Sequence, residues 1–212
     1  VALARALATS PGLLLLDEPL SALDAKVRVF LRKQIKNLQR KLGVTTIMVT
    51  HDQEEAQTMA DRIFVMKDGE IIQVGTPTEI YKRANSPFIA DFIGVMNFIP
   101  ATIAKNNKAH CISVNIDCDT QDFQNNQSVQ LAIRPEDIQL NAEKSDNNVL
   151  EVTIKEIEFL GSFQRIYLEA SGVTKDLIMA DVPNFNAQKI NMALNDKLNI
   201  YFPAENIRVY PN

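Results

Sequence analysis

Apolar and polar residues are arranged in two different patterns along the first part of the chain. Apolar runs at Leu13–Leu16 and Thr45–Val49 are bounded by turn residues, and runs of this length favour strands buried on both faces of a parallel sheet. Between them, apolar residues recur at helical spacing before Gly43, a candidate C-cap: Val27, Phe30, Leu31, Ile35, Leu38 and Leu42. Alternating strands and amphipathic helices predict an α/β domain over residues 1–96.

Local signals predict shorter elements in the rest of that domain. Asp52 is a candidate helix N-cap, with a glutamate three positions later. The Asp-Gly pair at 68–69 lies between the apolar runs Ile63–Lys67 and Glu70–Val74 and predicts a two-residue hairpin. Residues 76–79, Thr-Pro-Thr-Glu, combine a capping box with proline at the first helical position. These signals predict two short helices that flank a hairpin.

The pattern changes near residue 97. Strand-like pieces then recur between clusters rich in Asn, Asp and Gly: Gln130–Arg134, Val149–Phe159, Arg165–Glu169, Leu198–Phe202 and Ile207–Tyr210. Short strands separated by turn signals predict a small β-barrel or sandwich. The charge balance shifts at the same place, since residues 1–96 hold 12 basic and 11 acidic residues while residues 97–212 hold 10 and 15. We therefore expect a second domain over residues 97–212.

Composition argues against several classes of protein. The chain has 212 residues, of which 46% are hydrophobic and 23% charged, the values of an ordinary globular protein. Its net charge of −4 provides no basic field for nucleic acid. No apolar run approaches the ~20 residues of a membrane-spanning helix. Cys111 and Cys118 form neither a CxxC pair nor a disulfide framework, and with two histidines they offer no basis for a His/Cys metal cluster.

One face of the helix predicted before Gly43 is basic. It carries Arg28, Arg32, Lys33, Lys36 and Arg40. These side chains could form a nucleic-acid surface, but the domain is nearly neutral and no aromatic residues alternate with them. A face exposed to solvent is the better interpretation.

Two carboxylates follow the leucine run, in the segment Leu13–Pro19. In open α/β sheets, ligands bind at the carboxyl ends of strands. Asp17 there could hold Mg²⁺ through water, and Glu18 could orient or deprotonate a water that attacks a γ-phosphate. From the residue types alone, a strand followed by an acidic turn is an equally good interpretation.

The second apolar run also ends in polar residues, Thr50-His51-Asp52. If the two strands are neighbours, their ends converge on one site, where His51 could donate a hydrogen bond to a γ-phosphate. Taken alone, His51 is more often an ordinary histidine at a helix start. The ordered set that also includes Ser21–Asp24 is far more specific than any single member.

These motifs, in this order, resemble the second half of the nucleotide-binding domain of an ABC transporter. Val1–Leu7 resembles the helix after the family's signature motif, Leu13–Pro19 the Walker B segment, Ser21–Asp24 the D-loop and His51 the switch histidine. The resemblance implies that Asp17 belongs to the Mg²⁺ site and that Glu18 is the general base. It also implies that Asp24 communicates across a dimer at the nucleotide and that His51 senses the γ-phosphate during catalysis.

The remainder of the chain resembles one branch of the family. Residues 61–81 are similar to importers of polyamines, maltose, iron and phosphonates. Residues 134–137, 159–161 and 202–206 resemble the family's C-terminal OB-like domain, called TOBE. The implied fold is an α/β partial P-loop NTPase domain over 1–96, without its Walker A half, followed by an all-β OB-like TOBE domain over 97–212.

The resemblance implies an ATP-hydrolysing importer subunit that powers uptake of a small solute, such as a polyamine or aminoethylphosphonate. Its implied partners are a second ATPase subunit in a homodimer, membrane permease subunits and, indirectly, a solute-binding protein, with no nucleic acid. Its implied location is the cytoplasm, peripheral on the inner face of the membrane.

A G-x-x-x-x-G-K-[ST] motif, which would cradle the β- and γ-phosphates, does not occur in the chain. We therefore expect this chain alone to be inactive, with ATP and Mg²⁺ bound only by an intact protein. Because the chain opens at Val1, in the middle of a predicted helix, we expect a truncated or proteolysed form of a longer product; the intact motifs make a pseudogene remnant the weaker alternative. The alternative function is a non-enzymatic regulatory or dimerisation module that binds an effector or partner through the TOBE-like domain.

Overall fold

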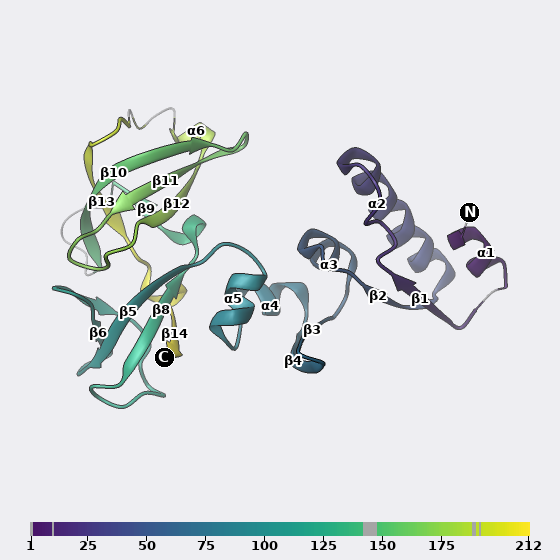
Figure 1. Ribbon diagram of the computed structural model, residues 1–212, viewed down its shortest axis with the longest axis horizontal. Helices are drawn as coiled ribbons and strands as arrows, with labels where there is room; N and C mark the ends of the chain where they lie inside the picture. The colour runs from purple at the N-terminus through teal and green to yellow at the C-terminus, as the bar shows by residue number, and fades with distance from the viewer. Residues whose placement is uncertain (1, 10, 142–147, 188–189, 191) are drawn as a thin grey trace. The chain divides into compact units, whose positions relative to one another are not determined.

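The computed structural model describes residues 2–9, 11–141, 148–187, 190 and 192–212. The chain divides into two compact units, Val1–Asn85 and Ser86–Asn212 (Figure 1). The division precedes the boundary expected after residue 96. Residues 86–96 therefore belong with the second unit, where the carbonyl of Val95 accepts a hydrogen bond from Arg134 Nη1 at 2.9 Å.

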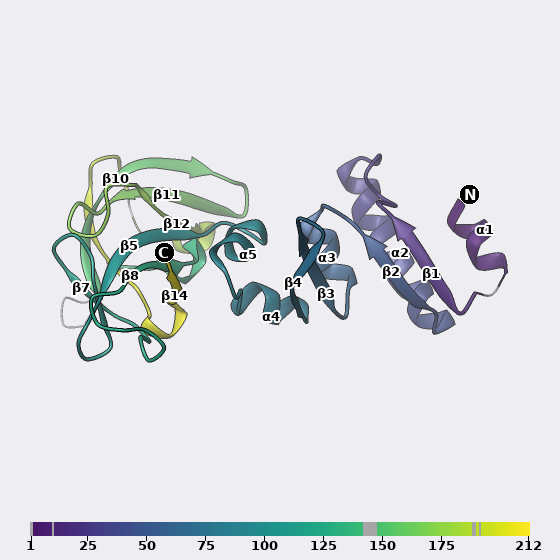
Figure 2. The same ribbon diagram turned by 60° about the horizontal axis from the view of Figure 1, so that its bottom comes forward.

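The first unit contains a β–α–β segment, a short helix and a hairpin. Its elements are α1 (Ala2–Ala8), β1 (Leu13–Asp17), α2 (Ala25–Leu42), β2 (Thr45–Val49), α3 (Gln53–Met59), β3 (Ile63–Lys67), β4 (Glu70–Gly75) and α4 (Pro77–Lys82). Strands β1 and β2 pair in parallel, from Leu13 opposite Thr45 to Asp17 opposite Val49 (Figure 2). The two predicted strands are therefore neighbours, and their carboxyl ends lie together.

Capping residues fix the ends of these helices. Asp24 is the N-cap of α2, and Gly43 ends that helix in the left-handed conformation, with φ of 62°. Thr76 and Glu79 form the expected capping box at α4. In the hairpin of β3 and β4, the Asp-Gly pair at 68–69 has positive φ at both residues, as a two-residue type I′ turn requires.

One face of the β1–β2 pair is open, so the expectation of strands buried on both faces is wrong for the described chain. Leu14 is buried, whereas Leu13, Leu15, Ile47 and Val49 are exposed, with Leu15 at 67%. Successive side chains point to opposite faces of a strand, and two strands with a single crossover helix leave one face uncovered. The open face is apolar.

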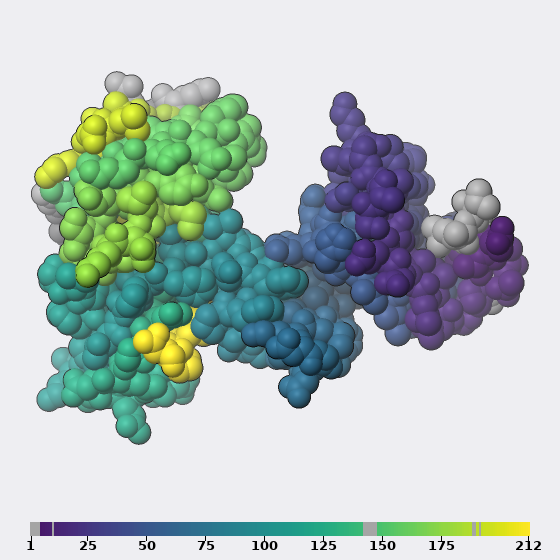
Figure 3. All heavy atoms as spheres, in the orientation of Figure 1, coloured from purple at the N-terminus to yellow at the C-terminus, as the bar shows by residue number. Residues whose placement is uncertain are grey.

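The second unit is built mainly from strands. It contains α5 (Pro87–Phe92), β5 (Asn97–Ala104), β6 (Lys108–His110), β7 (Asn115–Asp117), β8 (Ser128–Ile133), β9 (Gln139–Leu140), β10 (Val149–Phe159), β11 (Phe163–Glu169), β12 (Ile178–Pro183), α6 (Asn184–Ala187), β13 (Lys197–Tyr201) and β14 (Arg208–Pro211), with 3-10 turns at Pro135–Asp137 and Ala204–Asn206. The strands form two five-stranded sheets, ordered β14-β8-β5-β6-β7 and β12-β11-β10-β13-β9. In Figure 3 the yellow C-terminal atoms lie against teal atoms, in keeping with the pairing of β14 and β8.

Both sheets contribute to one hydrophobic core. Its largest fully buried members include Ile99, Leu131 and Ile133 from one sheet and Ile154, Ile166, Leu168 and Ile178 from the other. Free Cys111 and Cys118 are also buried in this core. The unit therefore has a core of its own, as an independently folding domain requires.

Two buried asparagines connect the sheets through backbone groups. Asn97 on β5 donates to the carbonyls of Ile133 and Met179 and accepts from the N–H of Met179 at 2.7 Å. Asn148 likewise accepts from the N–H of Asp117 and donates to the carbonyl of Phe202. Because a buried polar group without a partner is costly, each asparagine fixes several strands in one arrangement.

The segment at 134–137 has a structural role in this unit. Pro135–Asp137 forms a 3-10 turn directly after β8, and Arg134 is buried beneath it. These contacts favour a structural turn over a regulatory or partner-binding loop for this segment.

Candidate functional site

The carboxyl ends of β1 and β2 bring two of the predicted site residues together. Oε1 of Glu18 lies 3.2 Å from ring Nδ1 of His51. Both side chains remain accessible, with 46% of Glu18 and 72% of His51 exposed. A carboxylate beside one imidazole nitrogen orients the ring and leaves Nε2 available to a ligand.

The backbone of Glu18 is held in an uncommon conformation. Its φ is 42°, in the left-handed region that non-glycine residues rarely adopt. Its N–H donates to the carbonyl of Val49 at 2.9 Å, and its own carbonyl accepts from the hydroxyl of Ser21 at 3.0 Å. Contacts on both sides thus sustain a strained residue, a feature that is frequent at functional sites.

Asp17 is the last residue of β1, next to this pair. Its side chain is exposed, and no hydrogen bond or ion pair joins its carboxylate to another residue in the described part of the chain. An exposed carboxylate can accept hydrogen bonds from the hydration shell of Mg²⁺, which keeps several of its waters when bound. Across the described ranges, no three His, Cys, Asp or Glu side chains gather as a metal site by themselves.

Asp24 has a different environment from the other three residues. Its Oδ1 accepts from the N–H groups of Lys26 and Val27, both at 3.1 Å, at the first turn of α2. The carboxylate is therefore engaged as a helix cap rather than joined to Glu18 or His51. Movement of the turn that contains Asp24 would consequently move the start of α2.

A hydrogen-bond network fixes the segment on which His51 lies. Thr50 donates its hydroxyl to Glu55 at 2.7 Å and accepts from the N–H of Asp52 at 3.0 Å. Asp52 caps α3 by accepting from the N–H of Glu55 at 3.0 Å, as the sequence predicts. Its second carboxylate oxygen accepts from Arg28 Nη1 at 2.8 Å. His51 is thus flanked by two anchored residues.

The electrostatics of Asp52 follow from these contacts. Partial burial alone would raise the pKa of Asp52, but the N–H groups at the start of α3 and the guanidinium of Arg28 outweigh that effect and hold the pKa below its usual value. Asp52 is therefore ionised at neutral pH and keeps its partner Arg28.

Sequence reasoning missed the basic residues that face α3. Only 7% of the Arg32 side chain is exposed, and Arg32 donates to Glu54 at 2.9 Å, while Arg28 bonds to Asp52. The expectation that this face of α2 is exposed to solvent is therefore wrong at Arg28 and Arg32. A signal was present, because Arg28 and Arg32 are four residues apart on one helical face and the start of α3 is acidic.

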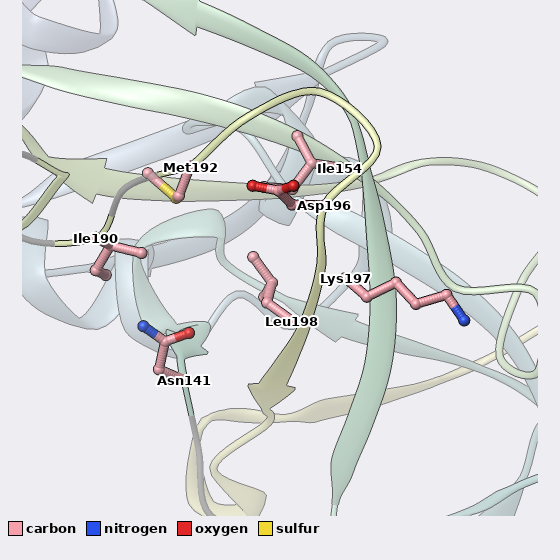
Figure 4. A pocket seen from close by; sticks show the side chains of 7 residues that line it. All are labelled: Asn141, Ile154, Ile190, Met192, Asp196, Lys197 and Leu198. Carbon is pink, nitrogen blue, oxygen red and sulfur yellow. The ribbon is translucent and has the colours of Figure 1, made fainter.

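A cavity lies in the second unit, beside β10 and β13. This cavity of about 390 Å³ is lined by Asn141, Ile154, Ile190, Met192, Asp196, Lys197 and Leu198 (Figure 4). Lys197 points away from the other side chains and bonds to Glu151, and Asp196 accepts from the N–H of Ala193. Its charged groups therefore do not converge on a ligand position.

The chain is similar to several known proteins. The TOBE domain family matches residues 131–209, within the second unit. The chain is 46% identical over 221 residues to the Fe(3+) ions import ATP-binding protein FbpC 2 of Rhizobium meliloti, covering 99% of this chain and 56% of the relative. It is 42% identical to the sulfate/thiosulfate import ATP-binding protein CysA 2 of Chromobacterium violaceum, covering 100% of this chain and 58% of that protein. The chain is a homologue of the ATP-binding subunits of ABC importers.

This relationship confirms the resemblance found in the sequence, including the TOBE domain. A third relative, the spermidine/putrescine import ATP-binding protein PotA of Malacoplasma penetrans, is 42% identical over 93% of this chain and 33% of its own length. The chain thus spans about half the length of the first two importer subunits and less of the third. A solved structure of the cytoplasmic molybdate-binding protein ModG aligns at 12% identity, over 61% of this chain and 99% of its own, with a TM-score of 0.46.

Within the residues that the structure describes, no helix is both long and apolar enough to cross a membrane.

Proposed function

We propose that the first unit supplies the Walker B, D-loop and switch-histidine part of an ATPase site in an ABC importer subunit. The observation that carries this proposal is the contact between Glu18 and His51 at the adjoining ends of β1 and β2. In an open α/β sheet this edge is where ligands bind. Homology to proteins named as import ATP-binding subunits supports the same assignment.

Each residue has a distinct chemical role in this proposal. Asp17, exposed at the end of β1, would hold Mg²⁺ through the ion's hydration shell, and the bound ion would supply positive charge to the phosphates. Glu18 accepts the proton of the water that attacks the γ-phosphorus. The new P–O bond forms as the bond between that phosphorus and the oxygen bridging to the β-phosphate breaks, and ADP leaves with the electron pair of the broken bond. His51 acts as an imidazolium, in which Nδ1–H donates to Glu18 and Nε2–H donates to a γ-phosphate oxygen.

The wider assembly is part of the same proposal. A second copy of the subunit would face the turn that contains Asp24, and membrane permease subunits on the cytoplasmic side would use the closure of the two copies. The relatives are named for iron, sulfate/thiosulfate and spermidine/putrescine. We propose a small solute such as a polyamine, the solute for which the PotA relatives are named. Its choice would reside in the permease and the solute-binding protein.

Titration calorimetry with ATP and Mg²⁺ tests the proposal. We expect the full-length subunit that carries this chain, with a phosphate-binding loop upstream, to bind ATP and hydrolyse it. The 212-residue chain alone should show no binding, since it has no G-x-x-x-x-G-K-[ST] motif. Failure of the full-length subunit to bind ATP would contradict the proposal. Binding by the short chain would show that other groups hold the phosphates.

A second candidate is a regulatory module in residues 86–212, and the self-contained core of that unit favours it. Expressed alone, the unit should unfold cooperatively and bind an effector or a partner. A unit that folds alone but neither binds a ligand nor alters the ATPase rate of the full-length subunit would leave only a structural role.

A further inference from the structure

One guanidinium group contacts both segments that flank the candidate site. Arg28 Nη1 donates to Oδ2 of Asp52 at 2.8 Å, and Arg28 Nη2 donates to the backbone carbonyl of Leu23 at 3.1 Å. Leu23 immediately precedes Asp24 in the turn before α2, and Asp52 immediately follows His51. The two nitrogens of one side chain therefore connect the turn of Asp24 to the segment of His51.

From this bridge we propose that Arg28 is a positioning residue that couples the position of the Asp24 turn to that of His51. This inference rests on the proposed ATPase function. Arg28 itself need touch neither nucleotide nor metal. Its effect would be transmitted through Asp52, whose neighbour His51 contacts Glu18.

Hydrogen bonds connect each end of the bridge to the segment whose position it is proposed to set. At one end, the N–H of Arg28 donates to the carbonyl of Asp24 at 2.9 Å, within the first turn of α2. At the other end, Asp52 is held by the N–H of Glu55 and bonds through its own N–H to Thr50. A displacement of the Asp24 turn thus reaches His51 through short, directional hydrogen bonds.

The geometry requires arginine rather than any cation. The planar guanidinium presents separate N–H groups in a fixed fork, so it can serve a carboxylate and a carbonyl at once. Lysine offers a compact charge on a flexible stem and would keep attraction to Asp52 without fixing the carbonyl of Leu23. Arg28→Lys therefore separates the charge of Arg28 from its bridging geometry.

Arg32 provides a matched control on the same helix. It also joins α2 to α3, through Glu54 at 2.9 Å, and its side chain is more buried than that of Arg28, at 7% against 30% exposed. The ion pair of Arg32 with Glu54 involves neither the Asp24 turn nor the residues next to His51. Loss of Arg32 should therefore weaken helix packing without changing the coupling.

The first test uses the 212-residue chain and needs no ATP. The chain has only two histidines, so isotope-labelled histidine gives two backbone amide signals, and a His110→Gln variant assigns that of His51. We expect Asp24→Ala to shift the His51 amide signal in the wild type and in Arg32→Met. The same substitution should produce less than about half that shift in Arg28→Met, because the bridge is gone. An equal shift in Arg28→Met would overturn the proposal.

The second test measures ATP hydrolysis by the full-length subunit. Arg28→Met should lower kcat roughly tenfold with little change in KM, because it misplaces His51 without removing a binding group. It should cause no further loss in a His51→Ala background, while Arg28→Lys recovers only part of kcat and Arg32→Met remains near wild type. Equal losses in both backgrounds would contradict positioning through His51. A wild-type subunit without ATPase activity would refute the proposed function, while the amide experiment would still decide the coupling.

Discussion

Glu18 and His51 lie with Oε1 and Nδ1 3.2 Å apart, although they follow different strands. Their proximity results from the parallel register of β1 and β2, which places Asp17 opposite Val49. The backbone reinforces it, since the N–H of Glu18 continues the pairing to the carbonyl of Val49. A carboxylate and an imidazole are thereby presented together at an open strand end.

The first prediction concerns the proton acceptor. Glu18→Gln preserves size and the possibility of a hydrogen bond to His51 but removes the basic oxygen. In the full-length subunit we expect kcat for ATP hydrolysis to fall by about 10²–10³-fold, with ATP affinity maintained. Single-turnover kinetics and nucleotide titration measure the two quantities separately. Unchanged kcat would exclude Glu18 as the general base.

The second prediction concerns the pH dependence of the first unit. The pKa of Asp52 is lowered in the folded chain, so its ionised form stabilises the fold above the unfolded pKa. This stabilisation is lost as pH falls through the lowered folded pKa. Asp52→Asn keeps an oxygen for the helix cap but loses the charge that holds Arg28. It should therefore destabilise α3 by roughly 0.5–1 kcal/mol near neutral pH, measured by hydrogen exchange.

The difference between Asp52→Asn and the wild type should shrink at acid pH, below about pH 4, where wild-type Asp52 also takes up a proton. Thr76→Ser, in a capping box that lacks this ion pair, is a suitable control and should show no such convergence. A difference that is constant with pH would mean that the charge of Asp52 contributes nothing.

The third prediction concerns the contact between the two sheets of the second unit. Asn97→Ala removes the partners of the carbonyls of Ile133 and Met179 and of the N–H of Met179. Leaving such buried groups unsatisfied should destabilise this unit by about 2–4 kcal/mol in urea unfolding. As a control, Asn125→Ala at an exposed position should change the stability of this unit by less than about 0.5 kcal/mol. Similar losses in both variants would argue against a role specific to Asn97.

The fourth prediction concerns the two buried thiols. Burial raises the pKa of Cys111 to about 11, and burial together with neighbouring Cys111, Asp117 and Asp119 raises that of Cys118 to about 12. The thiolate is the reactive form, so both should resist a thiol-specific disulfide reagent in the folded chain and react rapidly in denaturant. Rapid reaction of either thiol without denaturant would contradict its burial.

The same shifts predict sensitivity to alkali. Because the folded pKa values lie above the unfolded value, the neutral thiols stabilise the fold fully below about pH 9. That contribution is lost as pH rises toward the raised values. A Cys111→Ala, Cys118→Ala double variant should therefore show a shallower loss of stability over this alkaline range than the wild type, when urea midpoints are compared.

Local sequence signals predicted much of the first unit. These signals are local in sequence. They are the apolar run Leu13–Leu16, the residue that ends α2 and the Asp-Gly pair of the β3–β4 turn. The convergence of Glu18 and His51 also followed once the two strands were taken as neighbours. The role of Arg28 did not, because helical spacing identifies a face but not the acidic helix that covers part of it.

The second unit was predictable in class but incomplete in detail. The bounds of β10, Val149–Phe159, were predicted correctly, since alternating apolar residues mark that strand. Strand β5 was missed, and Pro100 within it is a residue that usually argues against a strand interior. Asn97 both donates a hydrogen bond to Met179 and accepts one from it. Because these residues are far apart in sequence, no local pattern could reveal the contact.

Within the residues that the structure describes, β1 has an uncovered apolar face and one edge without a paired strand, and this has a geometric consequence. A strand that adds to this edge in parallel would take the register that β1 imposes, as β2 does. Its carboxyl end, and any loop that follows, would then arrive beside Asp17 and Glu18. The edge of β1 therefore determines the position of the incoming loop. The hydrogen-bond register with which a new strand pairs to β1 also sets the distance between that loop and the carboxylates of Asp17 and Glu18.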